Sequence, residues 1–412
     1  MAKDSSKTRP SLVVRQLRLS AVRGPLKGKR FRFSSHRVRV GKAENNDVVI
    51  PDDTVSRHHF EILRDIRGFL VRDLESTNGT LLDGAQIREA YIRPGSIVAA
   101  GGARLKFSIG EDRRDPELFE GTSYGPLVFK SLAMRRLVGA AKEIALSSLP
   151  LLVLGEPGTG KKTLCRAVHA ASSRRNAPLV FLKASRRMDI SPPVSGNEGI
   201  NIARLLREAS TGSLVIEEPW ELSNEEQSTL AMSLKRLVTK NGEPGVRLFA
   251  TTSRRLSAEV ENRRMDGPLA SYLGSMRVHM PALRDRPTDI QVLLDHFWDP
   301  ENKNHHGGFP PFLIDLFHRY SWPGNVRALR LMVETLASSR GVLPNSLELP
   351  TVSFEEGVSF RQQKKRWVDS FERAYLQWLI DGCGGNVSKA AREASMDRKH
   401  LNKLLKRHSI KS

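Results

Sequence analysis

One short stretch of the chain combines glycines and lysines at a spacing that suits phosphate binding. An apolar run, Leu151–Leu154, leads into a glycine-rich turn, and the residues after the turn have the pattern of a helix start. Backbone N–H groups in such a turn can close around phosphate oxygens, and the helix N-terminus adds a partial positive charge. The pattern predicts ATP or ADP as ligand, contacted by Gly155, Glu156, Pro157, Gly158, Thr159, Gly160, Lys161, Lys162 and Thr163.

The lysine pair in this stretch has two different implications. Lys161 is placed to reach the terminal phosphates, whereas Lys162 stands where a generic phosphate loop has Ser or Thr for Mg²⁺. The alternative is a glycine-rich turn with a chance lysine. The strand pattern before the turn and the helix pattern after it favour phosphate binding.

Two carboxylates follow a second apolar run further along the chain. The run from Gly212 to Ile216 ends in Glu217 and Glu218. A nucleotide-hydrolysing site needs one acid for Mg²⁺ and one to polarise water at such a strand end. Glu217 and Glu218 are therefore candidate catalytic acids, with Glu217 the candidate Mg²⁺ ligand. Without the upstream glycine-rich turn, they would be ordinary surface acids at a strand end.

Composition points to a polyanionic partner and a reducing environment. The 412 residues carry a net charge of +21, with basic side chains concentrated in residues 1–43 and 361–412. This favours nucleic acid first and an acidic membrane second. The two cysteines, Cys165 and Cys383, allow no disulfide framework or zinc spacing. With no run of transmembrane length and no secretory signal, the expectation is a cytoplasmic protein with no membrane partner.

The patterns divide the chain into four structural parts. Short alternating apolar runs with turn signals predict an all-β sandwich, and alternating helical and apolar segments predict a parallel α/β sheet. A small helical piece and a basic helical unit follow. The expected boundaries are a disordered tail 1–10, the sandwich 11–110, a linker 111–125, the α/β core 126–298, the helical piece 299–340, a linker 341–359 and the basic unit 360–412.

Four separated motifs lie in the predicted sandwich, at Val40–Lys42, Asn46–Ile50, Thr54–Phe60 and Asp73–Thr80. Together they resemble a forkhead-associated (FHA) domain. The resemblance implies binding of a phosphothreonine-containing protein through charge-assisted hydrogen bonds. Lys42 stands where the family more often has Arg, which removes a bidentate fork. The alternative is that Ser56, Arg57 and Asn78 only cap turns. Carried over by position, the phosphate contacts are Lys42, Ser56 and Arg57, and the peptide-backbone contacts are Thr77 and Asn78.

Two further motifs follow the predicted strand that ends in Glu217 and Glu218. They are Met280–Arg286 and Tyr320–Arg327. With the glycine-rich turn, they resemble the AAA+ domain of sigma-54-dependent enhancer-binding activators, from about Gly125 to Ser338. The resemblance implies an ATP-binding P-loop domain with a helical lid, in which Arg327 is the second sensor arginine. It also implies RNA polymerase holoenzyme as a partner.

Several expected AAA+ residues are replaced. The interval 184–210 has nothing like the GAFTGA sequence that engages the sigma factor in this family. The family's first acid is Asp, and here it is Glu217. Ser253 stands where the family has its sensor Asn, and Lys183 stands where the family has the Asn that positions the catalytic glutamate. The two arginine-finger positions hold Asp266 and Tyr272. Because an arginine finger neutralises transition-state charge, these replacements predict nucleotide binding with weak or absent hydrolysis.

The C-terminal unit contains two short helical segments separated by a tight turn. Asn386 and Asp397 are placed to cap segments 387–394 and 398–408, with Leu401, Leu404 and Leu405 facing a core. The segments resemble a Fis-type helix-turn-helix, which implies binding to double-stranded DNA as a homodimer or higher oligomer. A merely solvated basic face is the alternative. The candidate DNA contacts are Arg398, Lys399, His400, Asn402, Lys403, Lys406 and Arg407.

A long apolar stripe precedes these two segments, between residues 360 and 383. We expect it to form core or a dimer interface, not a ligand site. Its members are Trp367, Phe371, Ala374, Tyr375, Trp378 and Leu379.

The sequence therefore predicts a multidomain protein: an all-β FHA sandwich, an α/β AAA+ P-loop domain with a small helical lid, and an all-α Fis-type helix-turn-helix. The favoured function is a bacterial transcriptional regulator that couples phosphothreonine recognition and ATP binding to promoter control, without remodelling sigma-54 polymerase. One alternative is an ATP-hydrolysing sigma-54 activator. Another is a phosphorylation-dependent interaction scaffold.

Overall fold

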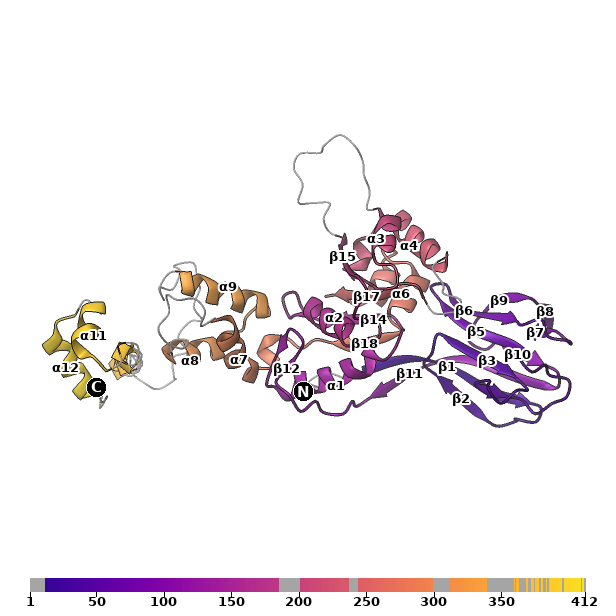
Figure 1. The fold of residues 1–412 in the computed structure, drawn as a ribbon, viewed down its shortest axis with the longest axis horizontal. Coiled ribbons are helices and arrows are strands. Elements are labelled where there is room, and N and C mark those ends of the chain that lie inside the picture. The colour runs from indigo at the N-terminus through magenta and orange to yellow at the C-terminus, as the bar shows by residue number, and fades with distance from the viewer. Residues whose placement is uncertain are drawn as a thin grey trace, which may run out of the picture. The chain divides into compact units, whose positions relative to one another are not determined.

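The computed structural model describes residues 12–184, 201–236, 244–298 and 311–338, Ser359, and residues 361–410 apart from 363–367, 370, 371, 374, 378, 381, 382, 384, 395 and 409 (Figure 1). Within these residues, no helix is both long and apolar enough to cross a bilayer. The predicted tail 1–10, much of linker 341–359, and stripe residues Trp367, Phe371, Ala374 and Trp378 lie outside the described residues.

The N-terminal region is a sandwich of two sheets around one apolar core. One layer contains β2 (Arg30–Phe33), β1 (Leu12–Arg23), β11 (Ala103–Arg114), β10 (Ile97–Ala100), β7 (Thr80–Leu82) and β8 (Ala85–Ile87). The other contains β4 (Val48–Val49), β3 (Arg37–Gly41), β5 (Phe60–Asp65), β6 (Gly68–Asp73) and β9 (Glu89–Ile92). Alternating burial along β1 and β11 places Leu17, Leu19, Leu105 and Phe107 in the core between the layers.

The structure corrects three features of the sandwich predicted from sequence. Strands β8, β9 and β10 had no predicted counterpart. From its apolar alternation we expect the first strand to span Leu12–Leu19, but β1 continues four residues further, to Arg23. Strand β11 runs to Arg114, so the predicted linker 111–125 begins as strand, because Leu12–Arg15 of β1 pair with Glu111–Arg114. A short pair, β12 (Ser123–Tyr124) and β13 (Leu127–Val128), lies at the end of that interval.

The central region is a parallel sheet with helices, as predicted. Its strand order is β15 (Leu179–Lys183), β16 (Ser213–Glu217), β17 (Arg247–Thr252), β14 (Leu151–Leu154) and β18 (Met276–His279). Buried, continuous apolar runs such as β14 are typical of strands covered on both faces. The helices are α1 (Leu132–Ala145), α2 (Lys161–Ala170), α3 (Ile202–Glu208), the 3-10 helix η2 (Pro219–Glu221), α4 (Asn224–Arg236), α5 (Leu256–Glu261) and α6 (Gly267–Leu273).

The sandwich and the parallel sheet share hydrogen bonds. Val13 and Val14 of β1 pair antiparallel with Arg277 and Met276 of β18. Beside this junction, His36 is 6% exposed, and its Nε2 lies 3.1 Å from the Ser148 carbonyl. Burial, with smaller contributions from the charges of Arg64 and Arg247, lowers the pKa of His36 to about 4. The imidazole is therefore neutral at pH 7, and the Tyr272 ring lies 6.3 Å away.

A helical lid follows, and it begins earlier than predicted. Its elements are the 3-10 helix η3 (Leu283–Asp285), α7 (Thr288–Phe297), α8 (Pro311–Arg319) and α9 (Asn325–Ser338). Leu283, Ile290 and Leu294 share one apolar core with Phe317 and Leu329. Because α7 buries its apolar face in that core, the lid begins near Ala282 instead of residue 299. The C-terminal helices are α11 (Val387–Glu393) and α12 (Arg398–Arg407).

Candidate functional site: the phosphate loop and its neighbours

The glycine-rich turn joins β14 to α2, as the sequence predicts. Gly158 and Gly160 have φ of +77° and +103°, in the left-handed region that glycine adopts without strain. A Cβ on Gly158 would also lie 2.1 Å from the Gly324 carbonyl oxygen, so no side chain fits there. Gly160 is the N-cap of α2, so the loop presents the N-terminus of a ten-residue helix. This backbone can bind phosphate oxygens.

Lys161 lies over the loop that precedes it. Its Nζ donates to the carbonyl oxygens of Gly155 at 2.6 Å and Glu156 at 3.0 Å. Its ammonium group is therefore held beside the backbone that would cradle phosphate. Contact of Lys161 with the terminal phosphates stays a prediction.

The lid motifs hold the middle of the loop. Buried Arg286 donates from Nη2 to the Thr159 carbonyl at 2.8 Å, and Asn325 donates from Nδ2 to the Pro157 carbonyl at 3.0 Å. The backbone N–H of Arg327 donates to the Gly158 carbonyl at 3.2 Å, while its side chain is exposed. Arg327 is thus beside the loop, as predicted. The predicted set omitted Arg286 and Asn325, although both lie in the motifs that the sequence singled out.

An ion pair occupies the position predicted to hold Mg²⁺. The ammonium of Lys162, in the first turn of α2, lies 2.6 Å from Glu217 Oε2 at the end of β16. Mg²⁺ requires an octahedral set of oxygen ligands, and here an ammonium takes both the hydroxyl position and the carboxylate. The residues present do not fit the metal role predicted for Glu217.

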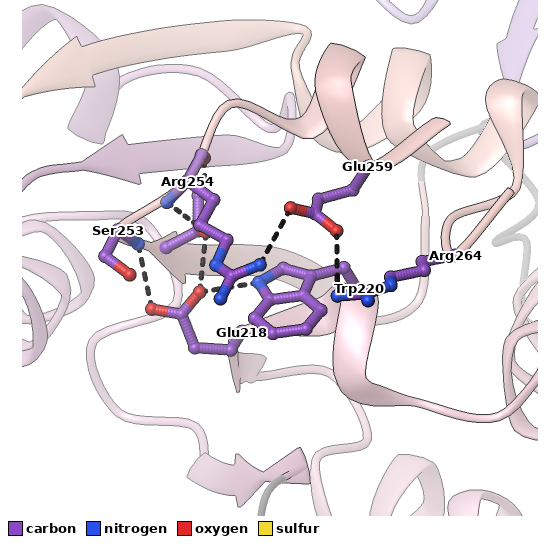
Figure 2. Close-up of polar contacts among 7 residues, drawn as sticks. Glu218, Trp220, Ser253, Arg254, Glu259 and Arg264 are labelled. Atoms are coloured by element: carbon purple, nitrogen blue, oxygen red, sulfur yellow. Dashed lines mark hydrogen bonds and ion pairs between the residues drawn. The ribbon is translucent and has the colours of Figure 1, made fainter. Parts of the chain in front are cut away.

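The second acid, Glu218, has both of its carboxylate oxygens hydrogen-bonded (Figure 2). Oε2 accepts hydrogen bonds from Trp220 Nε1 at 2.8 Å and Thr252 Oγ1 at 2.7 Å, and Oε1 accepts from the Ser253 N–H at 2.8 Å. The backbone of Glu218 is left-handed, at φ +48°, which costs roughly 1–2 kcal/mol for an L-residue. Ser253 thus contacts Glu218 through its backbone, without the side-chain amide that the family has there.

Two arginines lie over the Trp220 ring, and a buried acid pairs with both arginines (Figure 2). Arg254 Cζ lies 4.4 Å and Arg264 Cζ 6.0 Å from the indole centroid. Both guanidinium groups also pair with Glu259, whose side chain is 5% exposed, at 3.3 and 3.9 Å. Sequence reasoning missed this cluster, because its members come from η2, the loop after β17, α5 and the turn after α5 and are not regularly spaced.

The two predicted arginine-finger positions both have structural roles. Asp266 is the N-cap of α6, where its side chain accepts from the Leu269 N–H at 2.9 Å. Tyr272 is 7% exposed within the core of the α/β region, and burial raises its pKa. Neither residue offers a cation to a neighbouring molecule. Arg264, the nearby arginine, is engaged by Glu259 and Trp220.

The predicted phosphothreonine residues gather in adjoining loops of the sandwich. The Lys42 N–H donates to the Ser56 carbonyl at 2.9 Å, and Ser56 Oγ accepts from the Thr77 N–H at 3.0 Å. Asn78 Nδ2 donates to the Thr54 carbonyl at 2.8 Å. Arg57 is exposed, and within the described residues no ion pair or hydrogen bond of its guanidinium is recorded. The structure therefore brings all five predicted residues together.

A buried histidine, His59, fixes these loops. His59 is fully buried and its pKa is lowered by burial, so the ring is neutral. Its Nδ1 accepts from the Ser56 N–H at 3.1 Å, and its Nε2 lies 3.2 Å from the Gly79 carbonyl. One cation of the site is already paired, since Lys42 Nζ contacts Asp53 Oδ1. Asp53 was not among the predicted residues, and no motif pointed to it.

The C-terminal helices have the predicted caps and core. Asn386 and Asp397 accept hydrogen bonds from the first turns of α11 and α12. Leu401 and Leu405 are buried, and Leu404 packs against the same cluster. All seven candidate DNA contacts are exposed; they are Arg398, Lys399, His400, Asn402, Lys403, Lys406 and Arg407.

One of these seven, Arg407, forms ion pairs within the C-terminal unit. Arg407 pairs with Asp369 at 2.9 Å and with Glu372 at 3.5 Å, and the neighbouring His408 also contacts Glu372. This side chain is turned toward the preceding helical segment instead of lying free on the surface. Its predicted role in DNA contact is therefore less favoured than that of the other six.

Comparison with known proteins assigns three regions. Family models match for "Sigma-54 interaction domain" at residues 128–283, "FHA domain" at 38–101 and "AAA+ ATPase lid domain" at 284–352. The transcriptional regulatory protein ZraR of Escherichia coli (strain K12) is 32% identical over 301 residues, 68% of each chain. The anaerobic nitric oxide reductase transcription regulator NorR of Aeromonas hydrophila is 28% identical over 386 residues, 82% of this chain and 75% of that one.

Among solved structures, NtrX from Brucella abortus in complex with ADP aligns over 69% of this chain and 70% of its own, with 27% identity and a TM-score of 0.46. The identity and coverage of the ZraR match, together with the three family models, decide the assignment. The chain belongs to the sigma-54-dependent transcriptional regulators, with an FHA domain and an AAA+ lid in addition to the sigma-54 interaction domain.

Proposed function

We propose that this chain is a DNA-binding transcriptional regulator in which phosphothreonine recognition and nucleotide binding control promoter occupancy, without ATP-driven remodelling of sigma-54 polymerase. The observation that carries the proposal is the engagement of Glu218 by Trp220, Thr252 and Ser253. A general base must be free to accept a proton from the attacking water. This carboxylate already accepts three hydrogen bonds, two of them at Oε2.

The rest of the centre supports binding without turnover. Phosphate oxygens would be bound by the loop backbone, the helix N-terminus and Lys161. The groups that would stabilise the transition state are replaced, since Asp266 caps a helix and Tyr272 is buried. Loss of an arginine finger alone lowers phosphoryl-transfer rates by roughly 10³–10⁵. Nucleotide binding at this loop is therefore regulatory in the proposal, and Lys161 is the residue that senses the phosphates.

The two ends of the chain supply the input and the output. At the sandwich, Ser56, Arg57, Thr77 and Asn78 would bind a phosphothreonine-containing protein, with Lys42 released from Asp53. At the C-terminus, the exposed cations of α12 would enter the major groove of double-stranded DNA. Fis-type units act as pairs on two-fold sites, so a homodimer or larger assembly is part of the proposal.

The runner-up is an ATP-hydrolysing activator of sigma-54 polymerase, which the family assignment itself favours. Open-complex formation in vitro separates the two functions. Purified protein, sigma-54 holoenzyme, ATP and a promoter fragment bound by this protein are mixed, and promoter melting is followed. We expect retarded DNA without melting; nucleotide-dependent melting would contradict the proposal. A phosphorylation-dependent scaffold, the third candidate, predicts no salt-sensitive DNA retardation and no specific genome occupancy.

A further inference from the structure

The Lys162–Glu217 ion pair lies where a nucleotide-hydrolysing centre holds its metal. Lys162 is the first residue after Lys161, and Glu217 ends the strand whose next residue is Glu218. The two charged atoms lie 2.6 Å apart, close enough for a charge-assisted hydrogen bond. Both side chains retain contact with solvent, with 40% and 20% of their areas exposed, so a phosphate can approach the pair.

Charge and donor geometry show what this pair can do. An ammonium has three N–H donors, and one contact to Glu217 leaves two for phosphate oxygens. The charge of Glu217 also keeps the ammonium at the strand end, so its position is set before any ligand binds. A divalent cation at the same place would meet a like charge on Lys162 and a carboxylate that is already neutralised. The pair therefore opposes metal binding and favours an anion.

We propose that the Lys162 ammonium is a tethered substitute for Mg²⁺, so that the loop binds the metal-free nucleoside di- or triphosphate. This inference rests on the nucleotide binding proposed above and specifies the form of the ligand. Free ATP carries about two more negative charges than its Mg²⁺ complex, and two adjacent lysines meet that charge. The affinity for ATP in a chelator is then equal to or higher than the affinity in Mg²⁺.

Titration of the full-length protein with ATP, with excess EDTA or with excess Mg²⁺, tests this by calorimetry. We expect the wild-type dissociation constant in EDTA to be no higher than in Mg²⁺. Lys162→Thr restores the generic hydroxyl and is expected to weaken binding in EDTA by about tenfold, with partial recovery in Mg²⁺. Arg166→Gln is the matched control, because it removes a cation from the exposed face of the same helix outside the loop.

A second variant keeps the test independent of the lysine. Glu217→Gln preserves the side-chain volume and a carbonyl oxygen that can still accept from the ammonium, but it removes a negative charge beside the phosphates, so binding of metal-free ATP should become severalfold tighter. Binding that requires Mg²⁺ in the wild type, or Glu217→Gln that weakens binding in EDTA, would overturn the inference while nucleotide binding stands. Absence of ATP binding by the folded wild type in both conditions would overturn both the inference and the proposed nucleotide function.

Discussion

Asp53 is expected to compete with a bound phosphate for Lys42. The two side chains form an ion pair at the predicted phosphothreonine loops, with Asp53 97% and Lys42 46% exposed. A phosphopeptide must displace Asp53 or share the ammonium with it. Exposed ion pairs are weak, so Asp53→Asn should tighten binding by only about two- to fivefold. The gain should shrink as salt rises, because exposed charges are screened.

Arg57→Ala provides the opposite and larger change. Its guanidinium is exposed and free of recorded partners within the described residues, so it is available for bidentate contact with phosphate. Loss of such charge-assisted bonds costs about 1.5–3 kcal/mol, or about 10- to 150-fold in affinity. Together, the two variants test whether Arg57 is available to phosphate at once and whether Lys42 must first be released from Asp53.

Fluorescence anisotropy measures both variants with one labelled peptide, selected from a phosphothreonine library, and its unphosphorylated form. Glu44→Gln is the matched control, since this exposed acid lies two residues from Lys42 and makes no recorded ion pair in the described part of the chain. Weaker binding by Asp53→Asn at low salt would show that Asp53 supports the site and would refute the reasoning. Equal binding of the two peptide forms would refute phosphothreonine recognition altogether.

Three further predictions test other parts of the chain. His36 has a folded pKa of about 4 against 6.5 in the unfolded chain. Its contribution of about 3 kcal/mol to the free energy of unfolding is therefore complete above pH 6.5 and is lost as pH falls toward 4. The urea midpoint should fall over that range more steeply in the wild type than in His36→Phe. Gly158→Ala should abolish calorimetric ATP binding, because its Cβ would clash with Gly324. In retardation assays, Lys403→Ala should lower the salt slope of DNA binding by about one, and the already paired Arg407→Ala by less.

The strands and caps follow closely from local sequence. Turn residues on both sides predict strands at Gly68–Asp73 and Thr80–Leu82, and these are the bounds of β6 and β7. Strands β8 and β9 were missed because most of their residues are exposed, which leaves little apolar alternation to detect. Asn386 and Asp397 were predictable as caps, since a cap depends only on the backbone of the next turn.

The contacts that decide the function are not local. Lys162 and Glu217 are 55 positions apart in the sequence, and Glu218 and Thr252 are 34 apart. The sequence identified Lys162 and Glu217 as unusual residues at a phosphate site, but only the parallel sheet shows that they pair. The Trp220 cluster could not be inferred from any motif, because Arg254, Glu259 and Arg264 reach it from different turns.

The central claim is that the chain binds nucleotide but does not turn it over at an enzymatic rate. A paired measurement of ATP binding and ATP hydrolysis on one full-length preparation, with and without DNA and in both EDTA and Mg²⁺, tests it most directly. The account predicts saturable binding that Lys161→Ala abolishes, and turnover far below about 1 s⁻¹ in every condition. Turnover of about 1 s⁻¹ or faster that is lost in Lys161→Ala would contradict it.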